Sequence, residues 1–107
     1  SEMCIRDSPH TYQHPNPEEF MLARIFSALS DPTRLEMVKR LKDNQEHDSL
    51  TLAEGMPRST LTYHTRILRE AGITRSRGEG RTCMISLRTQ DLEKRFPGLL
   101  ENIIKHT

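Results

Sequence analysis

The chain of 107 residues lacks several features that would assign it to particular classes of protein. It has no uninterrupted apolar stretch of the roughly 20 residues that a transmembrane helix needs, and no secretory signal pattern. Its two cysteines, Cys4 and Cys83, are too few for a disulfide framework. We therefore expect a protein of the reducing cytosol with no membrane attachment.

Signatures of catalysis are also missing. We find no glycine-rich loop of the kind that cradles phosphates. Serine, histidine and aspartate all occur, but not in the spacing or glycine framework that supports a nucleophile. We predict that the protein is not an enzyme and that it holds no cofactor.

Composition and charge favour one small domain with a polyanionic partner. Hydrophobic residues make up 34% of the chain, which allows only a modest core, and burial against a second copy would add to it. The formal net charge is +1, yet six arginines lie between positions 58 and 81, against Glu70 and Glu79. A local basic patch on a nearly neutral protein suits nucleic acid better than general stickiness would.

The stretch Arg58–Gly72, RSTLTYHTRILREAG, predicts an amphipathic helix that reads DNA. One face can pack, because apolar side chains recur on it at helical spacing. The opposite face carries hydrogen-bonding side chains of the lengths that reach base edges and phosphates. The packing face consists of Leu61, Thr65, Leu68 and Ala71, and the polar face of Arg58, Ser59, Thr60, Thr62, Tyr63 and Arg66. The alternative is an exposed helix with ordinary surface arginines.

The residues before this helix favour a helix-turn-helix. Ser49–Glu54 predicts a short helix with Ser49 as its N-cap, and Gly55-Met56-Pro57 predicts a tight turn. A short helix, a glycine-containing turn and a longer polar-faced helix form this DNA-binding arrangement. A generic two-helix corner has the same pattern. Further upstream, Asp31-Pro32 opens another helix, with an acidic N-cap and a proline at the first helical position.

After Gly72 the periodicity changes from helical to alternating. Ile73–Arg77 and Arg81–Leu87 predict two strands joined by Gly78-Glu79-Gly80. We place Arg75, Arg77 and Arg81 around the tip of this hairpin. A basic hairpin directly after a helix-turn-helix is typical of a wing that grips phosphates. The alternative is a hairpin whose charged edges only prevent association.

The two ends of the predicted domain are apolar helices. Glu18–Leu29 is apolar nearly all round, which indicates burial on two sides. Thr89–His106 is helical with Thr89 as N-cap and a break at Pro97. We expect these helices to pair with each other and with their copies in a second subunit. The predicted interface residues are Phe20, Met21, Ala23, Phe96, Leu99, Leu100 and Ile103.

Residues 1–17 are polar, contain three prolines and lack periodicity, so we predict a disordered tail, followed by one domain over residues 18–107. Within the tail, Met3–Ser8 reads MCIRDS, which is what a transposase end sequence used in DNA library preparation would encode. A sequence-assembly artefact and a natural leader are both open, and we assign no function to this segment.

Three stretches resemble the ArsR-type winged helix-turn-helix repressors: FSALSDPTRLEMVKRL, STLTYHTRILREAGITRSRGEGR and LEKRFPGLL. Each is weak alone, but the spaced combination, from about Phe20 to Leu100, is specific. The resemblance implies a mainly α fold with a small β-hairpin, namely a winged helix-turn-helix with a two-stranded wing and a C-terminal dimerisation helix. It also implies a homodimer that binds a near-palindromic operator and releases it on a signal. Carried over by position, the DNA contacts fall on Arg58, Ser59, Thr60, Thr62, Tyr63, His64 and Arg66, with Arg77 and Arg81 on the wing.

The chain departs from the family in its metal ligands. Many relatives sense metal through paired cysteines in ELCVCDL, where this chain reads DSLTLAEG. Others use the last helix, where Asp91 and Glu93 are present here but Ile104 stands about where a downstream histidine is needed. Because metal ligands must converge in fixed number and geometry, we predict no metal. The inducing signal stays open among non-standard metal ligands, thiol oxidation at Cys83, a small organic ligand at the dimer seam, and none.

The sequence therefore predicts a dimeric, sequence-specific DNA-binding repressor that inserts residues 58–71 into the major groove. The alternative is a winged-helix protein-interaction or dimerisation module without specific DNA binding. The polar reading face and the basic wing favour DNA, because a docking face carries apolar anchors. His64 has two interpretations, as a phosphate contact or as a packing residue at the helix–strand junction.

Overall fold

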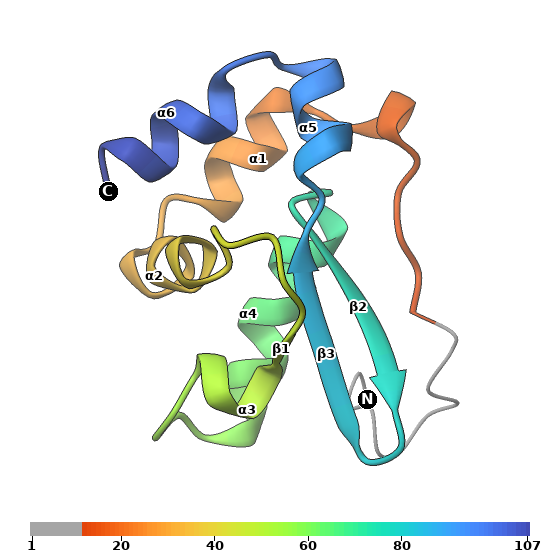
Figure 1. Ribbon diagram of the computed structural model, residues 1–107, viewed down its shortest axis with the longest axis vertical. Helices are drawn as coiled ribbons and strands as arrows, with labels where there is room; N and C mark the ends of the chain where they lie inside the picture. Colours follow the sequence, from red (N-terminus) through yellow and green to blue (C-terminus); the bar gives the residue numbers. More distant parts are fainter. Residues whose placement is uncertain (1–11) are drawn as a thin grey trace.

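The computed structural model describes residues 12–107, and it has the predicted architecture, mainly α with a small antiparallel sheet. In Figure 1, α1, α5 and α6 form the upper end, and α3, the start of α4 and the β2–β3 hairpin tip form the lower end. The elements in order are η1 (a 3-10 turn, Pro17–Glu19), α1 (Leu22–Ala28), α2 (Pro32–Arg40), β1 (His47–Asp48), α3 (Ser49–Leu52), α4 (Arg58–Glu70), β2 (Thr74–Glu79), β3 (Thr82–Leu87), α5 (Thr89–Arg95) and α6 (Leu99–Lys105). No helix in the described part of the chain is long and apolar enough to cross a membrane.

Helix α4 begins and ends where the sequence predicts. Pro57 is its N-cap residue, and Leu61 and Leu68 bury its apolar face in the core. Gly72 follows with φ of +90°, and Ile73 N donates to Leu68 O at 3.0 Å. This is a Schellman motif, in which a left-handed glycine closes the last turn of the helix. The chain therefore leaves α4 directly into β2, which fixes the hairpin relative to the helix.

The hairpin belongs to a three-stranded antiparallel sheet with the strand order β1-β3-β2. Glu79 pairs with Thr82, so the turn is Gly80-Arg81, and the predicted turn at residues 78–80 is wrong. Glycines on both sides of Glu79 made the register ambiguous. The third strand, β1, was not predicted, because its two residues are too few to show the alternation that indicates a strand.

The predicted helix over Glu18–Leu29 is divided. Phe20 is extended, with ψ of 133°, and it separates η1 from α1. The preceding turn is fixed locally, because Asn16 N donates to the Glu19 carboxylate at 2.7 Å in a capping box. Phe20 then turns inward, and only 4% of it is exposed.

Two predicted N-caps are displaced by one residue. Asp48, not Ser49, caps α3, and its carboxylate accepts from Leu50 N at 2.9 Å. Thr89 lies inside α5 after Arg88, and its hydroxyl donates to the side chain of Asn44. The predicted break near Pro97 is confirmed, because α5 ends before it and α6 starts after Gly98 in a left-handed conformation.

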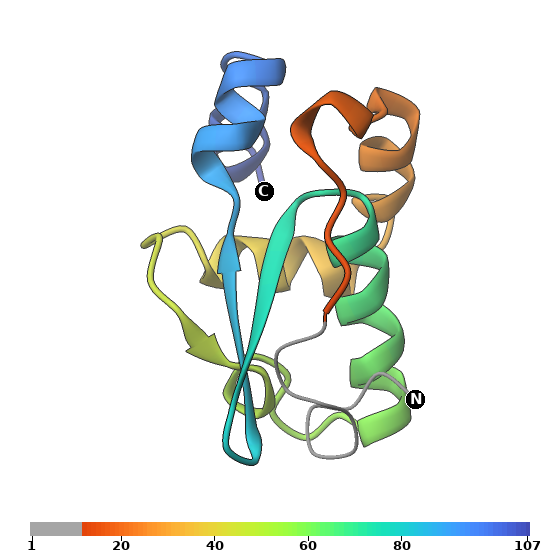
Figure 2. The ribbon, with the colours of Figure 1, turned by 90° about the vertical axis from the view of Figure 1, so that its right-hand side faces the viewer.

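Residues 12–17 fall in the predicted disordered tail, but they lie along the outer edge of β2 (Figure 2). Ser76 N donates to His14 Nε2 at 3.0 Å, and Arg88 Nη1 donates to Pro15 O at 2.8 Å. Burial, followed by the charge of Arg88, lowers the pKa of His14, so the ring stays neutral and can accept this bond. The ordered chain thus starts before residue 18. Residues 1–11, including Met3–Ser8, lie outside the described residues.

The core lies between α1, α2, α4 and the sheet. Its largest fully buried side chains are Ile25, Met37, Val38, Leu41, Leu68, Ile73, Thr74 and Ile85. Phe20 closes one side of it by packing directly on the backbone of Gly72. A Cβ placed on Gly72 would lie 2.2 Å from the Phe20 ring, so this contact requires glycine.

We expect Gly72→Ala to lower the free energy of unfolding by about 2–5 kcal/mol, from the left-handed backbone conformation and the overlap with Phe20. Gly80→Ala is the matched control, because Gly80 also has a positive φ but open space around it. It should lose only the conformational part, about 1–2 kcal/mol. Urea unfolding measures both, and equal losses would show that crowding against Phe20 has no energetic weight.

Candidate nucleic-acid interface

The polar face of α4 is exposed over the N-terminal two thirds of the helix. Arg58, Ser59 and Arg66 are exposed, Tyr63 is 58% exposed, and Thr60 and Thr62 are half-buried at the margin. Figures 1 and 2 show that the start of α4 and the hairpin tip lie at the same end of the molecule. The fold thus brings together two segments that the sequence analysis assigned to DNA.

His64 does not belong to this face. Only 8% of it is exposed, and its Nδ1 lies 3.0 Å from Arg34 Nη1. It packs inward, so its assignment as a DNA contact is corrected and the packing interpretation holds. The sequence carries a signal for this, because His64 lies three residues after Leu61 and four before Leu68, on the buried stripe.

The exposed basic patch contains fewer than the six arginines that lie between positions 58 and 81. Arg69 is 3% exposed, and its guanidinium lies 5.1 Å from the ring centroid of Tyr12. Arg75 pairs with Asp91 at 3.4 Å, next to α5 and away from the hairpin tip where we had placed it. Within residues 12–107, the exposed arginines of the patch without an ion pair are Arg58, Arg66 and Arg81.

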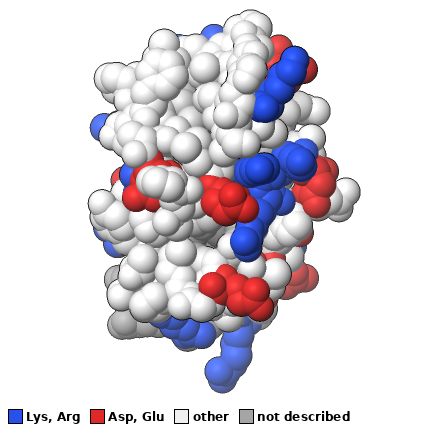
Figure 3. Space-filling view, turned by 90° about the vertical axis from the view of Figure 1, so that its left-hand side faces the viewer, with Lys and Arg blue, Asp and Glu red and all other residues white. Residues whose placement is uncertain are grey.

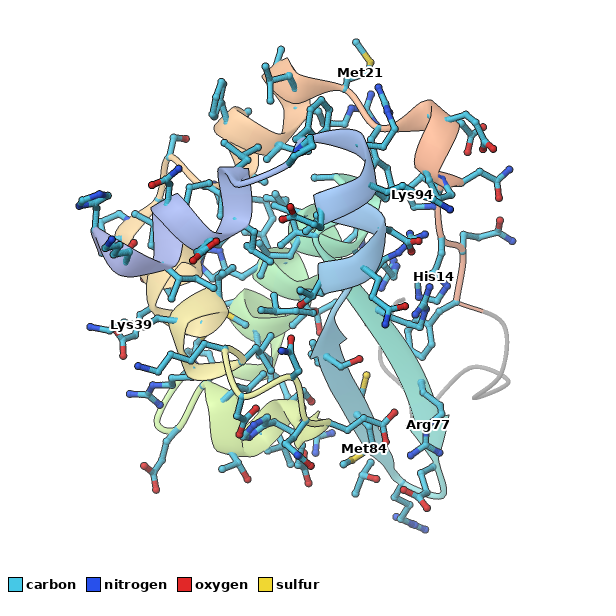
Figure 4. All side chains as sticks on the ribbon, turned by 45° about the horizontal axis from the view of Figure 1, so that its top comes forward. His14, Met21, Lys39, Arg77, Met84 and Lys94 are labelled. Carbon is cyan, nitrogen blue, oxygen red and sulfur yellow. The ribbon has the colours of Figure 1, made fainter. Side chains whose placement is uncertain are left out.

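Arg77 is already held by carboxylates (Figure 4). Its Nε and Nη2 donate to the two oxygens of Glu46 at 2.9 and 2.7 Å, and Nη2 also lies 3.2 Å from Glu79. The hydrogen bonds that Arg77 donates to Glu46 hold the pKa of Glu46 below its usual range and raise the pKa of Arg77. The side chains are about half exposed, so the pair adds little stability. It does tie the loop before β1 to the wing.

The opposite end of the molecule carries exposed apolar side chains from α1 and from its N-cap residue, Met21. Met21 is 56%, Leu22 42% and Phe26 51% exposed, while Ile25 of the same helix is buried. Met21 points away from the body in Figure 4, and few charged side chains cover the upper part of the face in Figure 3. Leu22 and Phe26 are absent from the predicted interface, which named residues by pattern without knowing which face of α1 meets the core.

The predicted interface residues fall into two groups. Phe20 and Leu100 are buried within the chain's own core and have almost no surface left for a partner, so their assignment to the interface is corrected. Those that keep accessible surface are Met21, Ala23, Phe96, Leu99 and Ile103.

Within the described residues, no three histidine, cysteine, aspartate or glutamate side chains converge as metal ligands would. Asp91 and Glu93, which match part of a family ligand set, have other partners. Asp91 accepts from Arg88 Nε at 3.0 Å, and Glu93 accepts from Gly98 N at 3.2 Å.

Comparison with known proteins places this geometry in a family. The family described as "Helix-turn-helix domain" matches residues 29–77. The HTH-type transcriptional regulator YceK of Bacillus subtilis is 37% identical over 84 residues, which cover 76% of this chain and 84% of that protein. An HTH-type regulator of Methanocaldococcus jannaschii, MJ1325, is 38% identical over 54% of this chain and 67% of its own.

Solved structures agree with the sequence relatives. An ArsR family transcriptional regulator superposes with a TM-score of 0.64 at 26% identity, covering 76% of this chain and 90% of the other. An ArsR-like regulator from Rhodococcus sp. RHA1 gives 0.58 at 30% identity, covering 79% and 80%. The chain belongs to the ArsR-type family of winged helix-turn-helix regulators, DNA-binding proteins that control transcription and are not enzymes.

Proposed function

We propose that the protein is a homodimeric repressor that reads a near-palindromic operator with the exposed face of α4. The observation that carries this proposal is the separation of two surfaces: the polar face of α4 and the hairpin tip lie at one end, and the apolar side chains of α1 lie at the other. A second copy can therefore cover the apolar end while both reading faces stay open to DNA.

We assign the recognition of DNA bases to side chains in the middle of α4. Tyr63 and Arg66 are exposed there, and an arginine that donates two hydrogen bonds to guanine contributes about 1–3 kcal/mol of discrimination. Arg58, Ser59, Thr60 and Thr62 lie in the first turns, where side chains and backbone amides suit phosphates.

The wing is assigned to phosphates beside the groove. Arg81 is exposed at the turn and has no ion pair among the described residues, so it can bind phosphate at once. Arg77 can do so only by exchanging Glu46 for phosphate. Glu46 is therefore an electrostatic competitor of DNA at this position.

The dimer is assigned to α1 together with the half-buried apolar residues of α5 and α6. Fully burying a Met, Leu or Phe side chain contributes about 1.5–3 kcal/mol, and α1 exposes three of them. In a two-fold dimer the two copies of α4 would read half-sites about 34 Å apart, which requires a near-palindromic operator.

Arg66→Ala should lose about 1–3 kcal/mol of discrimination at one base position. The measurement is fluorescence anisotropy with a duplex that the wild-type protein enriches from a random pool, its single-base variants and a scrambled duplex. Lys94→Ala removes the same charge from exposed α5 and should leave discrimination unchanged. If Arg66→Ala keeps wild-type affinity and preference, α4 does not read bases as proposed.

Arg81→Ala should weaken binding to all sequences and reduce the slope of log Kobs against log salt by about 1. Glu46→Gln should have the opposite effect on affinity, because it frees Arg77 and removes a negative charge near phosphate. Glu101→Gln, on α6 at the other end, is the charge-matched control. Titrations at several salt concentrations measure these effects, and an unchanged slope in Arg81→Ala would contradict the wing assignment.

Phe26→Glu should shift the protein from dimer to monomer and lower operator affinity, because a carboxylate would have to be buried without a partner. Leu50→Glu is the matched control for the oligomeric state, since Leu50 is exposed on α3, outside the apolar end. Sedimentation equilibrium reports the oligomeric state. A wild-type monomer at micromolar concentration, or a Phe26→Glu variant that still dimerises, would rule out this interface.

A further inference from the structure

Arg34 and His64 form a buried contact that joins three helices. Arg34 lies in the first turn of α2, and its Nη1 lies 3.0 Å from His64 Nδ1 in α4. Its Nε donates to the carbonyl oxygen of Ala28, the last residue of α1, at 2.5 Å. In the described part of the chain no carboxylate forms an ion pair with Arg34. The hydrogen bonds of this buried guanidinium thus go to neutral groups of two other helices, while the Asp31 carboxylate interacts with it only through its charge.

The chemistry of the pair fixes the state of the histidine. A guanidinium has donors only, so His64 Nδ1 must accept, and the neutral ring carries its hydrogen on Nε2. A leucine at position 64 would offer Arg34 no hydrogen-bond acceptor. The side-chain oxygen of asparagine falls near the position of Nδ1 and can accept instead.

The contact continues to the DNA-facing surface. The His64 and Tyr63 rings pack in an edge-type arrangement, with centroids 5.3 Å apart and planes at 62°. Tyr63 is exposed on the polar face of α4. If α4 shifted relative to α1 and α2, Arg34 would be left buried without its acceptor, which is strongly unfavourable.

We propose that the Arg34–His64 pair positions α4 relative to α1 and thereby determines sequence specificity without touching DNA. This inference rests on the proposed role of α4 as the reading helix. Base contacts depend on the placement of α4, whereas phosphate contacts carry no sequence information. Loss of the pair removes no cation from the DNA-facing surface, so it should reduce sequence preference and change the salt dependence less than Arg81→Ala does.

The test compares His64→Leu, which removes the acceptor, with His64→Asn, which keeps one. Each full-length variant is titrated with the duplex enriched by the wild-type protein and with a scrambled duplex at several salt concentrations. His64→Leu should lower the affinity ratio about tenfold, as the loss of one good base contact would, with a smaller change of the salt slope than Arg81→Ala causes. His64→Asn should restore most of the ratio. A wild-type ratio in His64→Leu, or equal losses in both variants, overturns the proposal.

Arg34→Met tests the partner. The double variant Arg34→Met/His64→Leu should lose no more sequence preference than the more affected of the two single variants, because both changes remove the same contact. Additive losses overturn the proposal. Urea unfolding checks that each variant is folded. If the variants do not fold, long-range proton–nitrogen spectra of the wild-type histidines decide: hydrogen on Nε2 of His64 supports the pair, and hydrogen on Nδ1 overturns it.

The same titrations separate this inference from the proposed function. A wild-type protein without sequence preference contradicts the reading role of α4, and the positioning role falls with it. A preference that is lost in Arg66→Ala but kept in His64→Leu contradicts the positioning role alone.

Discussion

The contact between Phe20 and the backbone of Gly72 is the constraint on which the rest of the structure depends. Gly72 ends α4 with a left-handed conformation and starts the turn into β2, so it sets the angle between the helix and the hairpin. Phe20 packs where a Cβ would lie, and the Arg88 guanidinium lies over its ring, 4.9 Å from the centroid. One small turn thus holds the N-terminal segment, the reading helix and the wing in a fixed relation.

That constraint explains how a chain with only 34% hydrophobic residues presents two separate surfaces. The core is used to join α1, α2, α4 and the sheet, and the polar face of α4 is left outside it. The arginine side chains are likewise divided between internal packing and the surface. Arg69 and Arg88 are drawn inward to hold residues 12–20, and Arg77 is held by Glu46, so within the basic patch of residues 58–81 the arginines without an ion pair lie on α4 and at the hairpin turn.

The sequence predicted α4 nearly to the residue because independent signals agree there: Pro57, Gly72 and an apolar stripe of helical period. It failed where structure depends on distant residues. Phe20 lies in an apolar run that reads as helix, and its burial is decided by a glycine 52 positions later. The Arg77–Glu46 pair spans 31 positions, and β1 exists only because β3 offers it an edge. The exposure of the polar face of α4 was therefore predictable, but the partners of individual side chains were not.

The inward orientation of His64 has a consequence for regulation that is independent of any particular signal. Helix α1 ends at Ala28, whose carbonyl binds Arg34, and the same guanidinium reaches α4. A change in how α1 packs against a second subunit would therefore act on an arginine that cannot lose either acceptor cheaply. The N–H donors of the buried Arg34 guanidinium can all find acceptors in only a few arrangements of the helices. Helix α4 would therefore move as a unit or stay in place. In the proposed dimer, a signal at the interface of α1 would thus need no separate path to reach the proposed DNA-binding end.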